Sequence, residues 1–154
     1  MMELYLVQHG EAKAEQEDPA RPLTDRGRKE VQRVARAAAR IGFEIAEIAH
    51  SGKLRAQETA EILAAQLQSA RGLSHRTGLA PMDDPATARQ AVEQAAEPIM
   101  LVGHLPHLGR LASLLLVGDP SKDMIAFRTG AIVCLAREAG GWRLKWILTP
   151  ELAP

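Results

Sequence analysis

The chain has 154 residues and a formal net charge of +0, because 19 lysines and arginines balance 19 aspartates and glutamates. Hydrophobic residues make up 46% of the sequence, which predicts one globular domain spanning residues 1–154. A balanced charge and an aromatic content of only 3% argue against nucleic acid or an anionic membrane as the main partner.

The sequence also bears on where the protein works. No apolar run is long enough to span a bilayer, and no secretory signal is evident in the first residues. The single cysteine, Cys134, lies in an apolar run and is expected to be a buried small hydrophobe without a disulfide partner. We therefore expect a cytoplasmic protein that acts as a monomer.

The first half of the chain predicts two strands and two helices. Residues 4–7 are an apolar run typical of a buried strand, and the run ends just before His9. Thr24 is expected to cap a helix that ends at Gly42 and buries the stripe Val31, Val34, Ala35, Ala38 and Ile41. Residues 45–50 predict a second strand, and residues 54–67 predict a second helix.

The second half predicts a loop, two more helices and three more strands. Residues 69–84 are weakly patterned and are expected to form a loop, which leads into a helix at 86–96 and a strand at 98–102. Pro106 suits the first turn of the next helix. Residues 131–137 and 142–148 then predict a hairpin around Gly140 and Gly141.

Alternating strands and helices that end in a hairpin predict an α/β fold. We expect a single three-layer domain with a mostly parallel sheet and an antiparallel edge. Ligands of such sheets bind beyond the carboxyl ends of the strands. The polar residues at those ends are Gln8 and His9, His50 and Ser51, and Gly103 and His104, with Arg55 close behind in the sequence.

Five short motifs occur at these positions in a defined order. They are Val7-Gln8-His9-Gly10-Glu11, Arg21-Pro22-Leu23-Thr24 with Gly27, Ser51 with Leu54-Arg55-Ala56 and Thr59-Ala60, Gly103-His104-Leu105-Pro106, and Thr129-Gly130-Ala131. In order and spacing the whole chain resembles the histidine phosphatase superfamily, and within it the small SixA-like phosphohistidine phosphatases. The resemblance implies a phosphoglycerate mutase-like fold. The larger phosphoglycerate mutases usually need additional residues for a lid.

The resemblance implies that His9 is the nucleophile and carries the phosphoryl group as a phosphohistidine. A neutral imidazole can attack phosphorus, and catalysis is then mainly positioning and electrostatic stabilisation. Arg55 offers a planar fork for phosphate oxygens, and His104 adds a second positive donor if it is protonated. Gln8, Gly10, Arg21 and Gly130 are expected to bind the substrate. Neither a metal nor another cofactor is required.

Three departures from the family pattern affect this interpretation. Gln8 stands where the family has arginine, and losing that charge costs on the order of 1–2 kcal/mol of transition-state binding. Gly52 replaces a proline, and Glu58 replaces a frequent glutamine and adds a negative charge close to Arg55. No carboxylate is clearly the proton donor. The candidates are Asp84 and Asp83, with Glu11 behind them.

The weak case for a proton donor favours a substrate whose leaving group needs little help. A phosphorus–nitrogen bond to imidazole breaks readily once the nitrogen is protonated, so phosphohistidine on a partner protein in signal transduction is the first choice. A small phosphorylated molecule is the second. A phospho-ligand binding module weakened by Gln8 is the third. His104 and His107 form an H-x-x-H pair, but no cysteine or carboxylate completes a metal site. His50 and His75 are expected to be structural or solvated.

Overall fold

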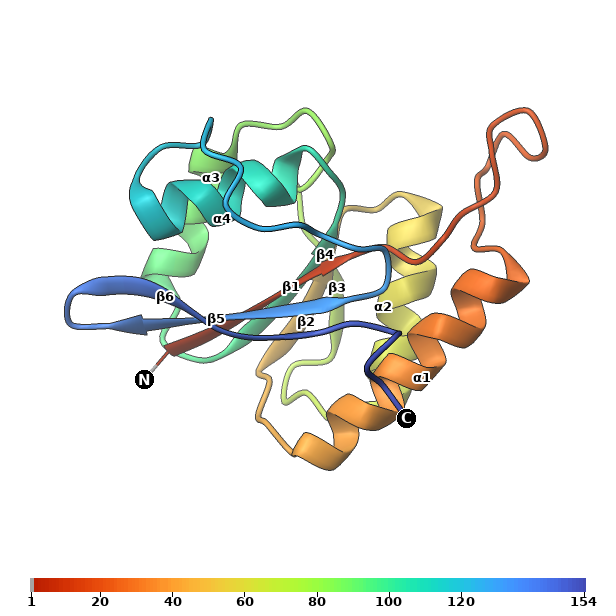
Figure 1. Ribbon diagram of the computed structural model, residues 1–154, viewed down its shortest axis with the longest axis horizontal. Helices are drawn as coiled ribbons and strands as arrows, with labels where there is room; N and C mark the ends of the chain where they lie inside the picture. Colours follow the sequence, from red (N-terminus) through yellow and green to blue (C-terminus); the bar gives the residue numbers. More distant parts are fainter. Residues whose placement is uncertain (1) are drawn as a thin grey trace.

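Six strands form one mixed sheet in the computed structural model, which describes residues 2–154 (Figure 1). The strands are β1 (Met2–Gln8), β2 (Glu47–His50), β3 (Leu73–His75), β4 (Ile99–Gly103), β5 (Ile132–Glu138) and β6 (Gly141–Leu148), in the spatial order β3-β2-β4-β1-β5-β6. β3, β2, β4 and β1 are parallel, whereas β5 and β6 are antiparallel to their neighbours. The predicted mostly parallel sheet with an antiparallel edge is confirmed.

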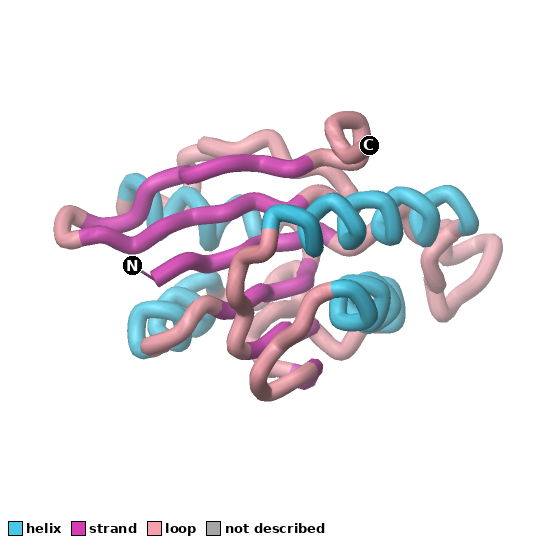
Figure 2. Tube along the Cα trace, turned by 90° about the horizontal axis from the view of Figure 1, so that it is seen from below, coloured by secondary structure: helices cyan, strands magenta, loops and turns pink. Residues whose placement is uncertain are grey.

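Two helices cover each face of the sheet, which gives the three predicted layers (Figure 2). α1 (Asp25–Ile41) and α2 (Leu54–Gln66) share one hydrophobic core with the sheet, and α3 (Pro85–Gln94) and α4 (His107–Val117) share the other. Alternate residues of β1 serve the two cores. Tyr5 and Val7 pack under α1 and α2, whereas Leu4 and Leu6 pack under α3 and α4. The sequence of a strand that is buried on both faces is a continuous apolar run, as in β1.

The boundaries of α1 follow from its capping residues. The Thr24 hydroxyl accepts a hydrogen bond from the Gly27 N–H at 2.9 Å, and Gly42 ends the helix with a φ of 78°. Val31, Val34, Ala35 and Ala38 are fully buried, as the stripe predicts. Including Ile41 in that stripe was wrong. Its side chain is 54% exposed, because the helix ends there beyond the edge of the sheet.

The sequence did not predict β3, which lies in the stretch expected to be a loop. Its three residues pair with β2 at the edge of the sheet and are exposed or half-buried, so no apolar alternation marks them. The hairpin turn is also shifted by one residue. Gly141 already pairs with Glu138 inside the ladder, so the two turn residues are Ala139 and Gly140.

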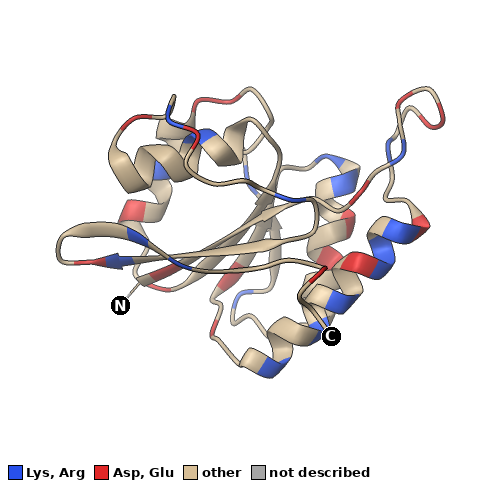
Figure 3. Ribbon diagram, in the orientation of Figure 1, with Lys and Arg blue, Asp and Glu red and all other residues tan. Residues whose placement is uncertain are grey.

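Charged residues concentrate on the helices and loops, whereas most of the sheet is uncharged (Figure 3). Cys134 is free and buried in β5, as predicted. Among residues 2–154, no helix combines the length and the apolar character needed to cross a membrane.

Candidate active site

The site begins where β1 and β4 end side by side. These parallel strands pair Gln8 with Gly103, and the His9 N–H donates to the Gly103 carbonyl at 3.0 Å. His9 and His104 therefore leave the sheet at the same level. The chain after β1 leads to α1 on one face, and the chain after β4 leads to α4 on the other. Such a divergence opens a crevice at the carboxyl edge of a sheet.

His9 has the geometry of a nucleophile. Its ring centroid lies 5.1 Å from that of His104, and its Nδ1 is 2.7 Å from the Gly10 carbonyl oxygen. A carbonyl only accepts, so Nδ1 must carry the proton and Nε2 keeps its lone pair. Burial lowers the pKa of His9, and the nearby Arg55 and Arg21 lower it further against the raising effect of the Gly10 contact. The imidazole is therefore neutral at pH 7.

His104 is also neutral in the free protein. Burial, reinforced by the charges of His9, Arg55 and Lys53, lowers its pKa to about 3. Its Nε2 lies 2.7 Å from the Ser51 hydroxyl, and that hydroxyl accepts from the Lys53 N–H at 3.3 Å. In the free protein His104 therefore does not supply the second positive donor that its protonated form would give. A bound phosphoryl dianion would have to raise its pKa first.

Two arginines supply the positive charge beside His9. Arg55, at the start of α2, lowers the pKa of both His9 and His104, and Arg21 lowers that of His9 and Arg55. Nε of Arg55 is buried and has no hydrogen-bond partner among the described residues. Arg21 adopts a left-handed backbone with φ of 51°, and its Nε donates to the Lys13 carbonyl at 3.0 Å. Two cations with free donors beside a neutral imidazole form an electrostatic site for a dianion.

Gln8 and Gly130 meet at the edge of this cluster. The Gly130 N–H donates to the Gln8 backbone carbonyl at 2.9 Å, which fixes the segment before β5 against the end of β1. Oε1 of the Gln8 side chain is buried and has no hydrogen-bond partner in the part of the chain that the structure describes. Because the Gly130 N–H already donates to Gln8, any contact that Gly130 makes with substrate must use other atoms. Its substrate-binding role stays a prediction.

Thr59 joins the loop at Gly10 to Arg55, and the sequence did not indicate a role for it. It is fully buried in α2, where its hydroxyl accepts from the Gly10 N–H at 2.9 Å and donates to the Arg55 carbonyl at 2.8 Å. Gly10 in turn accepts from His9 through its carbonyl. One side chain thus fixes the relative positions of His9 and Arg55. The available signal was its position one helical turn after Arg55.

The predicted proton donors are engaged elsewhere. Oε1 of Glu11 accepts from the Thr24 hydroxyl at 2.8 Å. Asp83 accepts from the Ala80 N–H at 2.9 Å, and Asp84 caps α3 by accepting from the Ala86 N–H at 2.9 Å. None of these bonds joins a carboxylate to His9 or His104. The proton-donor role of these three residues stays a prediction.

Glu58, expected to add negative charge close to Arg55, forms its ion pair with Arg28 instead. Its two carboxylate oxygens accept from the Leu23 N–H at 2.8 Å and from Arg28 at 3.1 Å. Glu58 therefore anchors the segment that contains Arg21 to α2, and the charge of Arg55 stays available to a ligand.

The remaining histidines have other surroundings. His50 is buried and its Nδ1 accepts from the Gly52 N–H at 3.0 Å, which supports the turn that carries Ser51. His75 is exposed and stacks on His50 at 5.9 Å between ring centroids. His107 is completely buried on α4. In the described part of the chain, no group of three or more histidine, cysteine, aspartate or glutamate residues could hold a metal ion.

Comparison with known proteins identifies relatives over the whole length. Residues 4–83 match the family model of the histidine phosphatase superfamily (branch 1). An uncharacterised protein of Picosynechococcus sp. is 34% identical over 85% of this chain and 83% of its own. The phosphohistidine phosphatase SixA of Escherichia coli is 26% identical over 97% of this chain and 94% of its own.

Solved structures agree with these matches. The protein histidine phosphatase SixA complexed with tungstate superposes with a TM-score of 0.82 at 25% identity, over 97% of both chains. A putative alpha-ribazole-5'-P phosphatase from Escherichia coli superposes with a TM-score of 0.77 at 17% identity, over 97% of this chain and 98% of its own. The second likeness concerns the fold alone.

Proposed function

The chain belongs to the histidine phosphatase superfamily, and on that premise we propose that it removes the phosphoryl group from phosphohistidine on a partner protein. Phosphatase activity is what the family and the SixA likeness support. The proposal adds the identity of the nucleophile, the substrate and the cellular process. His9 forms a covalent intermediate without a metal, and the enzyme acts as a monomer in cytoplasmic signal transduction.

One observation carries the proposal. Nδ1 of His9 contacts the Gly10 carbonyl at 2.7 Å, which holds an unprotonated Nε2 beside the two guanidinium groups of Arg55 and Arg21. A lone pair next to paired positive charge suits attack on a phosphoryl dianion. The carboxylates Glu11, Asp83 and Asp84 form hydrogen bonds to other groups. A leaving group that needs no carboxylic acid therefore suits the site best.

In the first step, Nε2 of His9 forms a bond to phosphorus while the bond between phosphorus and the substrate imidazole breaks. The bonding electrons return to the imidazole nitrogen. If the phosphohistidine ring arrives with its other nitrogen protonated, it leaves as a neutral imidazole and needs no proton from the enzyme. Arg55 and Arg21 balance the charge on the transferring oxygens.

In the second step, a water oxygen forms a bond to phosphorus and the bond to Nε2 of His9 breaks. The electrons of that bond restore the lone pair on His9, and inorganic phosphate leaves. The water loses a proton as it attacks. The neutral His104, 5.1 Å from His9 between ring centroids, is the base that we assign to that proton.

The test is phosphate release from a protein that carries phosphohistidine. We expect His9→Ala to lose turnover completely while it remains folded, and we expect His75→Ala, an exposed histidine, to retain the parental rate. Rapid quenching of the wild-type reaction should trap a label on the enzyme that is stable in base and labile in acid. A folded His9→Ala protein with parental turnover would disprove the nucleophile.

Two alternatives predict different results in the same experiment. A phosphatase of small molecules would hydrolyse small phosphoesters and ignore phosphohistidine; the fold it shares with an alpha-ribazole-5'-P phosphatase is compatible with this. The neutral Gln8 favours a binding module as the second alternative. Such a module would bind phosphate but would release no phosphate from any substrate. The relative rates on phosphohistidine and on a panel of phosphoesters separate the three possibilities.

A further inference from the structure

A groove of about 560 Å³ is lined by the segment that directly follows His104. One wall is the segment that leads into α4, with Leu105, Pro106 and Arg110. The other wall belongs to loop 118–131, with Asp123 and Ala126, and in Figure 1 this loop crosses the upper part of the molecule from α4 to β5. Both walls connect to the site within a few residues, because Leu105 directly follows His104 and the loop ends at Gly130, which binds Gln8.

Loop 118–131 is held in place along its length. The Ser113 hydroxyl of α4 donates to the Lys122 carbonyl at 3.1 Å and accepts from the Met124 N–H at 3.3 Å. Ile125 is buried in the core under α4. At the far end, Arg128 forms an ion pair with Glu30 of α1 at 2.8 Å. The groove is therefore formed before any ligand arrives, which lowers the entropic cost of binding.

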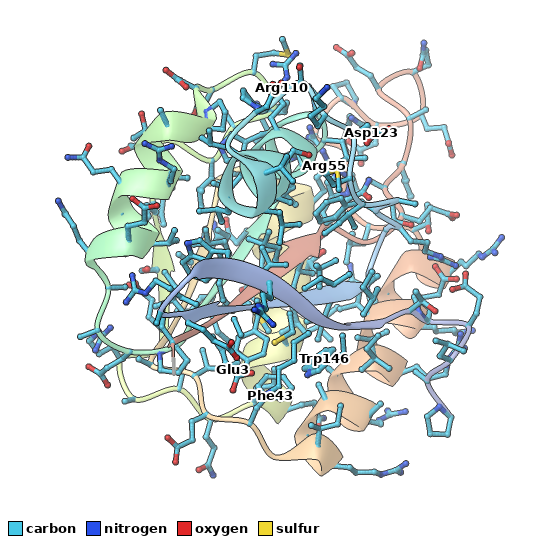
Figure 4. All side chains as sticks on the ribbon, turned by 60° about the vertical axis from the view of Figure 1, so that its left-hand side comes forward. Glu3, Phe43, Arg55, Arg110, Asp123 and Trp146 are labelled. Carbon is cyan, nitrogen blue, oxygen red and sulfur yellow. The ribbon has the colours of Figure 1, made fainter. Side chains whose placement is uncertain are left out.

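The lining of the groove combines apolar and charged groups. Leu105 is 41% exposed and Phe127 is half-buried, so both present apolar surface to an occupant. Arg110 and Asp123 are exposed on the two walls, and neither forms an ion pair within residues 2–154. In Figure 4 they lie on the same side of the β5–β6 hairpin as Arg55, whereas Glu3, Phe43 and Trp146 lie on the other side.

These features select one kind of occupant. Whatever fills the groove sits beside His104, so it must be the part of the substrate beyond the transferred phosphoryl group. A lone imidazole is far smaller than the groove. A polypeptide can offer an apolar side chain to Leu105 and Phe127 together with charges of both signs for Arg110 and Asp123, whereas a small polyanionic metabolite offers neither an apolar group nor a positive charge.

We infer that the groove binds the polypeptide around the phosphohistidine, with an apolar side chain near that histidine in the sequence seated against Leu105 and Phe127. The inference rests on the proposed function and adds how the partner is recognised. It makes recognition depend on the groove, while phosphoryl transfer depends on His9, Arg55 and Arg21. Rates on a large and a small substrate should therefore respond to different substitutions.

The test compares a peptide, carrying one phosphohistidine and a leucine four residues away, with phosphoimidazole as the small substrate. Ala126 is exposed and lines the groove, so Ala126→Trp should block it without touching His104. We expect kcat/KM for the peptide to fall by about tenfold or more, the worth of one buried leucine. The rate on phosphoimidazole should stay within about twofold, since its transition state does not reach the groove.

Two controls make the result specific. Ala139→Trp places the same side chain in the exposed turn of the β5–β6 hairpin and should leave both rates unchanged. A peptide with serine in place of its leucine should react slowly with the wild type and lose little more with Ala126→Trp. An unchanged peptide rate in Ala126→Trp, or equal losses on both substrates, would overturn the docking role. Wild-type protein that hydrolyses neither substrate would instead refute the proposed function itself.

Discussion

Gln8 is the residue that most distinguishes this site from the pattern it resembles. It is the last residue of β1 and directly precedes His9, the proposed nucleophile, and its Oε1 is buried without a hydrogen-bond partner within residues 2–154. The positive charge near His9 therefore comes from Arg55 and Arg21 alone among the groups that shift its pKa. Two cations balance a phosphoryl dianion without the third charge that an arginine at position 8 would bring.

The first prediction concerns this residue. Gln8→Arg should lower the inhibition constant of inorganic phosphate about tenfold, because a charge-assisted hydrogen bond is roughly twice as strong as a neutral one. The gain should shrink between low and high salt if solvent reaches the site. Gln66→Arg, at the exposed far end of α2, adds the same charge elsewhere and is the control. Equal constants for Gln8→Arg and wild type at both salt concentrations would contradict the prediction.

At the scale of elements, the first turn of α1 packs directly on the loop that follows His9. A Cβ at Gly27 would lie 2.2 Å from the carbonyl oxygen of Glu11, two residues after His9. This close approach requires glycine, since the neighbouring atoms are backbone. The helix, the Thr24 cap and the loop therefore form one unit, and the position of His9 depends on the position of α1.

The second prediction follows from that packing. Gly27→Ala should lower the free energy of unfolding by about 1–3 kcal/mol and reduce kcat, because the clash displaces the His9 loop. Gly109→Ala is a matched control in α4, where the nearest heavy atom is Leu105 Cδ2 at 3.8 Å. It should stabilise the protein by up to about 1 kcal/mol, since alanine favours the helix. Urea unfolding of both variants measures these effects, and similar shifts in both would argue against the packing role.

At the scale of the whole molecule, buried histidines make the fold sensitive to acid. Burial is the main cause that lowers the pKa of His9, His50, His104 and His107 in the folded state. The unfolded chain takes up protons at these residues near pH 6.5, whereas the folded chain does so only at lower pH. The unfolded state then binds more protons than the folded state. The stability that these histidines contribute is therefore complete above pH 6.5, and the free energy of unfolding falls as the pH decreases below that value.

The third prediction isolates one of these residues outside the catalytic cluster. His107 is completely buried, and neither ring nitrogen has a hydrogen-bond partner within residues 2–154. His107→Leu should raise the free energy of unfolding, and the gain should grow below pH 6.5 by up to about 1.4 kcal/mol per pH unit. Urea unfolding at pH 7.5 and pH 5 measures the difference. Parallel pH dependence in the two proteins would show that His107 does not contribute to acid sensitivity.

Much of the fold is determined by local sequence. A short segment with its own period or cap predicts each of four features: the apolar run of β1, the cap at Thr24, the stripe of α1 and the motif around His104. The three-layer fold with its antiparallel edge follows from their order. β3 was not predicted because its residues are partly exposed and show no clear alternation of apolar and polar side chains. Only its pairing with β2 makes it a strand.

The sequence by itself determined which residues could form the site, because His9, Arg55 and His104 follow predicted strands and match an ordered set of motifs. Only the tertiary structure decided their states. It gives His104 a pKa of about 3, pairs Glu58 with Arg28, and joins Gly10 to Arg55 through Thr59. Burial and contacts between distant segments depend on how strands and helices pack against one another, and no local pattern of residues encodes those distances.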